Sequence, residues 1–320
     1  MKINCSSYSI LVSPNETVLV NIGKKVTLFS ISNKNLNKRR QFYALKHASR
    51  AALSSDGKML AYINTSGHIA VHNIDTGELL VKSKCLNIEG YSLYFINDDK
   101  QIISSAWNGN VFVLDIKSGK TTVVNSFPFH KSTNLVPISY NNFIVISPIS
   151  SGETFAYDFT VKNNKAIFSE LFSSYSYRIK SLFFSYSEDE VLFFGSNINN
   201  SSDKWLSEDI AENVLFLYNI STKEFSPIAS IQELLGINCS LSEYGYFTSI
   251  CISKNKQYVL VGLSQSIIII DLLNKKHINT VKTKYLSSLH FVKFDTEVII
   301  GTWINIQIID FQKLCQMKQC

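Results

Sequence analysis

The chain of 320 residues contains few of the residues that interrupt regular structure. With 13 Gly and 5 Pro, it has no stretch that resembles a flexible linker of any length. No apolar run approaches the roughly 18 residues of a membrane-spanning helix. Residues 1–4 lead directly into the first strand-like segment, without an apolar core segment or a small-residue cleavage site, so we expect no signal peptide.

Cysteine and arginine are also sparse. The six cysteines form no CxxC pair and show no regular spacing, which favours reduced thiols and a cytoplasmic location. There are four arginines, and the lysines behind the net charge of +6 are scattered through turn-like segments rather than clustered. Nucleic-acid binders gather these residues on one surface, so we expect no nucleic-acid partner.

Motifs for catalysis are missing as well. None of the six histidines forms a metal-spaced pair with Cys, Asp or Glu, and no GxSxG, P-loop or dinucleotide fingerprint occurs. We therefore predict no metal, no cofactor, no catalytic residue and no enzymatic activity.

What is abundant is strand-forming sequence. The chain has 15 Tyr and 21 Phe, and its hydrophobic share of 45% is typical of a folded protein. Residues 92–120 read as three short strands joined by tight turns, one of them at Asn108-Gly109 between two apolar runs.

This unit recurs along the whole chain. Seven times, an apolar run ends in a small polar residue followed by an aliphatic residue or Phe, at intervals of roughly 40 residues with two longer gaps. The polar members are Ser30, Asn73, Asp115, Asp158, Asn219, Asp271 and Asp310. We expect them to make turn contacts with nearby backbone. A hairpin-like segment precedes each copy.

Each repeat is predicted to contain four strands, which we name a to d in chain order. Strand a is apolar and strand d is polar, as in a small sheet with one buried edge and one peripheral edge. Such sheets stack around an axis, so the sequence predicts an all-β, seven-bladed β-propeller with four antiparallel strands per blade, as a single domain over residues 1–320. We expect Leu314–Gln319 to form the last strand d, with Met1–Asn4 as the alternative.

The segments VHNIDTGE (Val71–Glu78) and VLDIKSGK (Val113–Lys120) resemble the end of strand c in the WD-repeat β-propeller family, although no copy has the Trp-Asp dipeptide. The resemblance covers the whole chain. It implies that b–c and d–a loops open on one face of the fold, where a protein or peptide partner binds, and that the chain is a non-catalytic, monomeric scaffold within a larger complex.

The two long gaps locate inserts at residues 196–213 and 231–247. The first contains Trp205 amid acidic residues, and we predict a helical turn there at Ser207–Glu212. In the second, we predict a short helical turn at Ser230–Leu235, followed by Tyr244 and Tyr246. The aromatic residues suit a basic or amphipathic partner segment. Alternatively, Trp205 covers the apolar edge of its own insert.

Further residues are expected near this face. Trp107 and Trp303 follow strand b in two repeats, where inter-blade packing is the alternative role. The starts of strand a contribute Arg50, Tyr91, Arg178 and Lys180, close to the expected central opening. A small anionic ligand, or an enzymatic site at the mouth of that opening, is the alternative function.

Overall fold

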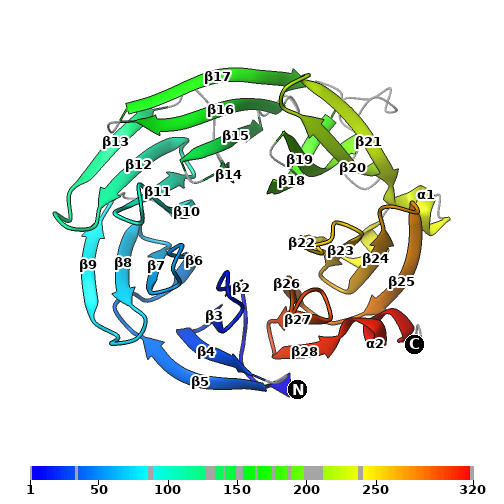
Figure 1. The fold of residues 1–320 in the computed structure, drawn as a ribbon, viewed down its shortest axis with the longest axis horizontal. Helices are drawn as coiled ribbons and strands as arrows, with labels where there is room; N and C mark the ends of the chain where they lie inside the picture. The colour runs from blue at the N-terminus through cyan, green and yellow to red at the C-terminus, as the bar shows by residue number, and fades with distance from the viewer. Residues whose placement is uncertain are drawn as a thin grey trace. The chain divides into compact units, whose positions relative to one another are not determined.

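A computed structural model describes residues 2–32, 35–85, 89–126, 134–139, 141–148, 154–162, 165–174, 177–185, 189–197, 212–236 and 241–317. Its strands form seven separate four-stranded antiparallel sheets (Figure 1). The predicted all-β, seven-bladed propeller with four strands per blade is confirmed. By internal contacts the chain divides into two compact units, Tyr8–Ser173 (the first unit) and Ser174–Cys320 with Met1–Ser7 (the second unit). A single domain remains a prediction, and each unit is described by itself.

The first unit contains four blades. Blade one is β2 (Ser9–Val12), β3 (Val18–Ile22), β4 (Val26–Ser32) and β5 (Asn35–Phe42). Blade two is β6 (Ala48–Leu53), β7 (Met59–Asn64), β8 (His68–Asn73) and β9 (Leu79–Lys84). Blade three is β10 (Gly90–Ile96), β11 (Gln101–Ala106), β12 (Asn110–Asp115) and β13 (Thr121–Ser126). Blade four is β14 (Asn134–Ser139), β15 (Asn142–Pro148), β16 (Thr154–Lys162) and β17 (Lys165–Ser174).

The second unit contains three blades. Blade five is β18 (Tyr177–Ser185), β19 (Glu190–Asn197), β20 (Glu212–Asn219) and β21 (Glu224–Ser230). Blade six is β22 (Phe247–Ile252), β23 (Tyr258–Leu263), β24 (Ser266–Asp271) and β25 (Lys276–Lys282). Blade seven is β26 (Leu286–Val292), β27 (Glu297–Thr302), β28 (Ile306–Asp310) and β1 (Lys2–Ile3). Its helical segments are α1 (Ile231–Leu235), the 3-10 helix η1 (Leu241–Tyr244) and α2 (Phe311–Gln316).

Packing between neighbouring blades builds the core. One cluster joins Leu28 and Phe42 of blade one to Leu60 and Tyr62 of blade two, and others join blades two and three, three and four, five and six, and six and seven. Strands b and c are covered on both faces, so they are almost continuously apolar; all six residues of β24 are buried. The sheets therefore stabilise one another in pairs.

The expected strand d of blade seven is wrong. β1 from the N-terminus fills this place, with Lys2 opposite Gln307 and Ile3 opposite Ile306. Residues 314–316 of the expected strand instead form the second half of α2, whose N-cap Asp310 accepts a hydrogen bond from the Lys313 N–H at 3.1 Å. Phe311 and Leu314, three residues apart on one helix face, are buried against the core of blades six and seven. Helical spacing and a capping residue outweigh strand formation there.

Strand d of blade one also differs from the sequence prediction. The sequence predicts a solvated turn at the basic run Lys34–Arg40 and strand d at Arg40–Lys46. Instead, β5 spans Asn35–Phe42 and includes residues 35–40 of the basic run. Arg40 donates from Nη1 to the Thr76 carbonyl at 2.7 Å and from Nη2 to the Asp75 carbonyl at 3.1 Å. These bonds tie β5 to the c–d turn of blade two.

The short helical turn predicted at Ser230–Leu235 is confirmed as α1. Ser230 is its N-cap and accepts from the Glu233 N–H at 3.3 Å, and Gly236 ends it in the left-handed region at φ 65°.

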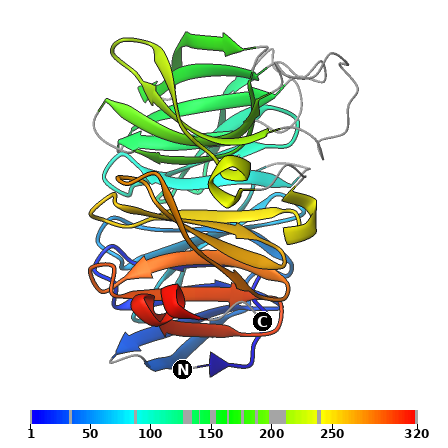
Figure 2. The same cartoon turned by 90° about the vertical axis from the view of Figure 1, so that its right-hand side faces the viewer.

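In Figure 2, α2 (red) lies toward the left edge of the second unit, and the yellow helical segment just before β22 lies toward the right. These are the two faces at which the turns of this unit open.

Candidate functional site

An exposed group of large side chains lies on the b–c and d–a connections of blades six and seven. Tyr246 is 62% exposed, Tyr285 53% and Trp303 49%, and Ile304 beside Trp303 is exposed as well. The rings of Tyr285 and Trp303 stack, with centroids 5.7 Å apart and planes 10° apart. We call Tyr246, Tyr285, Trp303 and Ile304 the aromatic patch. Exposed groups of large apolar and aromatic side chains are typical of binding surfaces.

Backbone hydrogen bonds hold the connections of the aromatic patch together. The Ser264 N–H donates to the Tyr246 carbonyl at 2.8 Å, and the Leu286 N–H donates to the Ser264 carbonyl at 3.0 Å. The Trp303 N–H donates to the Tyr285 carbonyl at 3.0 Å. Within this unit, b–c and d–a connections therefore lie side by side. A fixed backbone lowers the entropy lost when a partner binds.

A glycine permits the close crossing beneath Tyr246. Gly245 has φ 95°, a conformation that L side chains rarely adopt. A Cβ atom there would also lie 2.9 Å from the Gln265 nitrogen and even closer to the Ser264 hydroxyl. Gly245 therefore lets the d–a connection pass directly over the b–c turn of blade six.

Tyr244, predicted to bind a partner, is half-buried and packs against the core of blades five and six. Its carbonyl accepts from the Gln265 N–H and from the Ser266 hydroxyl, both at 3.2 Å. Tyr244 thus supports the crossing and contributes less open surface than Tyr246. Tyr285 was missed by sequence reasoning, because nothing local distinguishes it from other tyrosines before a strand.

The remaining candidates fall elsewhere. In the first unit, Trp107 is exposed on the b–c turn of blade three, and Arg50 is exposed on β6 with its Nη1 donating to the Ser49 carbonyl at 2.8 Å. Tyr91 lies in β10, at the register shift between Gly90 and Ser92. Arg178 and Lys180 lie at the start of β18, as predicted. A partner-binding role for these five residues remains a prediction.

Trp205 and all but the last residue of the helical turn predicted at Ser207–Glu212 lie outside the described residues, and Glu212 begins β20. Both roles weighed for Trp205 therefore remain open. The end of the first insert is described. There the Asn213 N–H donates to Gln232 Oε1 of α1 at 2.9 Å. This bond joins the end of the first insert to the start of the second.

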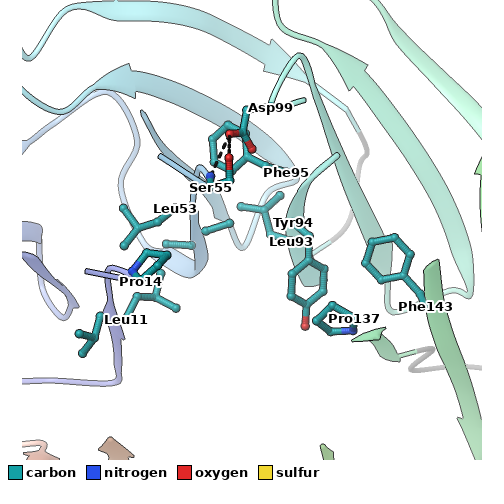
Figure 3. A pocket seen from close by; sticks show the side chains of 13 residues that line it. Leu11, Pro14, Leu53, Ser55, Leu93, Tyr94, Phe95, Asp99, Pro137 and Phe143 are labelled. Carbon is teal, nitrogen blue, oxygen red and sulfur yellow. Dashed lines mark hydrogen bonds between the residues drawn. The ribbon is translucent and has the colours of Figure 1, made fainter. Parts of the chain in front are cut away.

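The first unit contains a groove of about 360 Å³ between its strands a (Figure 3). Its lining is aliphatic, proline and aromatic, with Ser55 and Asp99 as polar members. Asp99, 8% exposed, accepts from the Ser55 N–H at 2.9 Å and from the Ser55 hydroxyl. Burial raises the pKa of Tyr94 to about 12, and its hydroxyl donates to the Leu135 carbonyl at 3.0 Å. The lining contains the Asp99 carboxylate and no lysine or arginine, so its charge does not match an anionic ligand.

His72 and Asp115, two titratable residues of the first unit, make hydrogen bonds within the fold. His72 lies between the Tyr62 hydroxyl and the Gly77 carbonyl, 3.2 Å from each, and burial lowers its pKa. At the end of β12, hydrogen bonds from Ser118 lower the pKa of Asp115, whose Oδ1 accepts from the Ser118 N–H at 2.8 Å. Among the described residues, no three His, Cys, Asp or Glu side chains gather as metal ligands would, and no helix is long and apolar enough to span a bilayer.

The turn contacts expected of the strand-c polar residues are present in most blades. Backbone N–H groups in the following turn, or in the first turn of α2, donate to Asn73, Asp115, Asn219, Asp271 and Asp310. Asp158 differs, because it lies in the middle of β16 opposite Ile144. None of these side chains belongs to a described pair suited to acid–base chemistry.

No family model and no curated protein sequence matches the chain. Solved structures do share its fold. A chain of hydrazine synthase from Kuenenia stuttgartiensis superposes with a TM-score of 0.77 at 11% identity, covering 96% of each chain. The β-propeller domain of Cps50 (Swd1) from Myceliophteria thermophila superposes with a TM-score of 0.72 at 12% identity, covering 97% of this chain and 99% of that one. Identities this low establish the fold class, a seven-bladed β-propeller, and nothing about activity.

Proposed function

We propose that the chain is a non-catalytic interaction scaffold that binds a protein or peptide through the aromatic patch. The observation that carries this proposal is the stacked, half-exposed pair Tyr285–Trp303, fixed beside Tyr246 by backbone hydrogen bonds. Rigid aromatic anchors contribute much of the binding energy in protein interfaces. The strand-c sequences support membership of the WD-repeat family, whose members bind partners in larger complexes. A cytoplasmic location and a lack of nucleic-acid binding remain part of this proposal.

The partner that fits best is a segment with apolar side chains. Ile304 and the two aromatic rings form the apolar part of the surface, and Lys284, exposed next to Tyr285, adds positive charge at its edge. An amphipathic segment that presents one apolar face and a nearby carboxylate would satisfy both parts. Lys284, at the edge of this surface, would affect the association rate more than the affinity.

The test begins with capture of partners from the native host and their identification. Binding of each identified partner is then measured by calorimetry for the wild type and for Tyr285→Ala combined with Trp303→Ala. We expect at least about tenfold weaker binding, because replacing a hot-spot aromatic residue by alanine costs about 2 kcal/mol or more of binding free energy. Tyr43→Ala, another exposed tyrosine outside the patch, is the matched control. Unchanged binding by the double variant would reject the patch as the interface.

The groove in the first unit supports a second candidate function, the binding of a small molecule. Its volume of about 360 Å³ falls within the range of ligand pockets. Its apolar lining and the Asp99 carboxylate favour a neutral or cationic apolar compound over the anionic ligand considered from the sequence. A thermal-shift screen of matched cationic and anionic aromatic compounds tests this. Stabilisation by anions alone would contradict the preference.

A further inference from the structure

The a–b and c–d turns of blades six and seven carry two strongly exposed apolar side chains. Phe294 is 86% exposed and Leu273 is 69% exposed, the two largest values among the described large hydrophobic residues. Phe294 lies at the tip of the β26–β27 turn, and Leu273 lies at the tip of the β24–β25 turn. Both side chains are therefore largely exposed at the tips of turns.

The backbone conformation of the Phe294 turn is unfavourable for an aromatic residue. Lys293, Phe294 and Asp295 have φ angles of 53°, 54° and 69°, three successive residues in the left-handed region. Glycine, asparagine and aspartate adopt this region at low energetic cost, whereas a phenylalanine does so with strain. Folding alone therefore favours a small polar residue at this position, and the aromatic side chain calls for another explanation.

Backbone and side-chain hydrogen bonds join these turns into one surface. The Lys254 N–H, in the a–b turn of blade six, donates to Asp295 Oδ1 at 2.8 Å. The Leu272 N–H donates to the Gln257 carbonyl at 2.7 Å, which ties the c–d turn to the a–b turn of the same blade. The Phe311 N–H donates to the Thr296 carbonyl at 2.9 Å, which brings in the start of α2. The two apolar tips thus belong to one continuous set of turns.

Exposed charge on these turns is positive. Lys254 lies with its Nζ 5.1 Å from the centroid of the Phe294 ring. Three more lysines, Lys275, Lys276 and Lys313, are exposed on the same set of turns. We call Phe294, Leu273 and these four lysines the tip surface.

The acidic residues of the same turns are engaged within the fold. Asp271 is buried and accepts from Asn274 and Gln257, and Glu297 is buried with the Lys293 Nζ 3.0 Å from its Oε2. Asp295 accepts from two backbone N–H groups, and Asp310 caps α2. Their charges are directed into turns and caps, so the surface presents lysine ammonium groups around apolar tips.

We propose that the tip surface docks onto an anionic lipid bilayer. Lysines attract an anionic leaflet at about 1 kcal/mol each, and apolar side chains on protruding turns enter the interface between headgroups and acyl chains. A single-stranded nucleic acid fits less well, because Leu273 cannot stack on a base and the Phe294 ring already has Lys254 against it. The absence of arginine from the tip surface also fits diffuse attraction rather than recognition of individual phosphates.

The test is co-sedimentation of the full chain with vesicles. We expect binding to phosphatidylcholine vesicles that contain about 30% phosphatidylserine, loss of binding with phosphatidylcholine alone, and weakening as salt shortens the Debye length below about 8 Å. Phe294→Asn with Leu273→Ser should weaken binding about tenfold or more, because each apolar side chain loses its transfer into the interface. Lys275→Gln with Lys276→Gln should also weaken it, by about 30-fold.

Controls separate this proposal from a folding defect and from the proposed function. Asparagine tolerates the left-handed region, so Phe294→Asn should melt at or above the wild-type temperature while it binds vesicles less. Tyr285→Ser with Trp303→Ser should leave vesicle binding unchanged. Absence of binding to anionic vesicles, or equal binding by the Phe294→Asn, Leu273→Ser variant, would overturn the proposal. Binding of an oligothymidylate in place of vesicles, weakened by the same lysine changes, would overturn it in favour of nucleic acid.

Discussion

The a–b turns of blades three and seven share one backbone and carry different side chains. In blade three, Asn97, Asp98 and Asp99 have φ angles of 52°, 53° and 59°, and in blade seven residues 293–295 have 53°, 54° and 69°. In each turn the residue after this run donates its N–H to the carbonyl of the first, at 3.1 Å in blade three and 3.3 Å in blade seven. Three consecutive non-glycine residues in the left-handed region are unusual, so the repetition indicates a common structural cause.

That cause is the third residue of each turn, an aspartate that reaches the preceding blade. Asp99 accepts from the Ser55 N–H at 2.9 Å, and Asp295 accepts from the Lys254 N–H at 2.8 Å and the Asn255 N–H at 3.2 Å. The left-handed run orients this carboxylate toward backbone N–H groups in the a–b turn of the preceding blade. Each turn therefore links two blades at the ends of their strands a and b.

The middle residue is where the turns differ. Asp98 is exposed and lies 3.4 Å from the Lys100 ammonium, whereas Phe294 is exposed beside Lys254. Aspartate suits the left-handed backbone and phenylalanine does not. The comparison distinguishes the third position, where folding requires aspartate, from the second position, where folding does not determine the residue. Phe294 therefore reflects a surface role.

The largest expected effect is loss of the linking carboxylate. Asp99→Ala removes a carboxylate that is 8% exposed, and with it the acceptor of the Ser55 N–H and hydroxyl, which should lower the free energy of unfolding by about 2 kcal/mol. Asp295→Ala should cost about 1 kcal/mol, because Asp295 is more exposed and water replaces it. Asp98→Ala should stay within about 0.5 kcal/mol. Urea denaturation measures all three, and a larger effect for Asp295→Ala than for Asp99→Ala would contradict the shared role as described.

A smaller effect is expected from exchanging the middle residues. Phe294→Asp should stabilise the protein by about 0.5–1 kcal/mol, since it relieves strain in the left-handed region. Asp98→Phe should destabilise it by about the same amount. Thermal melts of the two single variants and the double exchange give the values. A clear destabilisation by Phe294→Asp would show that the exposed ring supports the fold after all.

The smallest effect concerns acid sensitivity, at the turn that Asp99 links. Asp56 accepts from the Lys58 N–H at 2.9 Å and from the Ser54 hydroxyl at 2.7 Å, and these bonds lower its pKa below 3.8. A pKa lowered by folding adds stability above about pH 4, which is lost as the pH falls through the folded-state value. In blades one and six, Asn15 and Asn255 accept the equivalent bonds without titrating. Asp56→Asn should therefore make the melting temperature less dependent on pH between about 2 and 5, and Asn255→Asp should make it more dependent.

Local sequence predicted the hairpins well. The Asn108-Gly109 turn is present, with Gly109 at φ 83°. The polar sequence at Glu224–Ser230 predicts strand d of blade five, and β21 spans the same residues. Turn residues and strand alternation act over a few positions, so they can be read directly. The Ser-x-Asx sequences at Ser13, Ser54 and Ser253, whose hydroxyls hydrogen-bond to Asn15, Asp56 and Asn255, were also readable signals of a–b turns.

The candidate site was predicted only in part. Trp303 and Tyr246 were identified as loop aromatics, and both are exposed on connections of the second unit. Tyr285 was not identified, although its ring completes the stack with Trp303. The two residues belong to different connections, and no sequence pattern indicates that they meet.

The sequence by itself determined the number of sheets, their four-strand plan and the chemistry of the turns, because each depends on residues close together in the chain. Only the tertiary structure decided which chain end completes blade seven, that Asp99 and Asp295 link neighbouring blades, and that Phe294 stands beside Lys254. Those contacts join residues about 40 positions apart or at opposite ends of the chain, and hydrophobic packing between blades sets their distances.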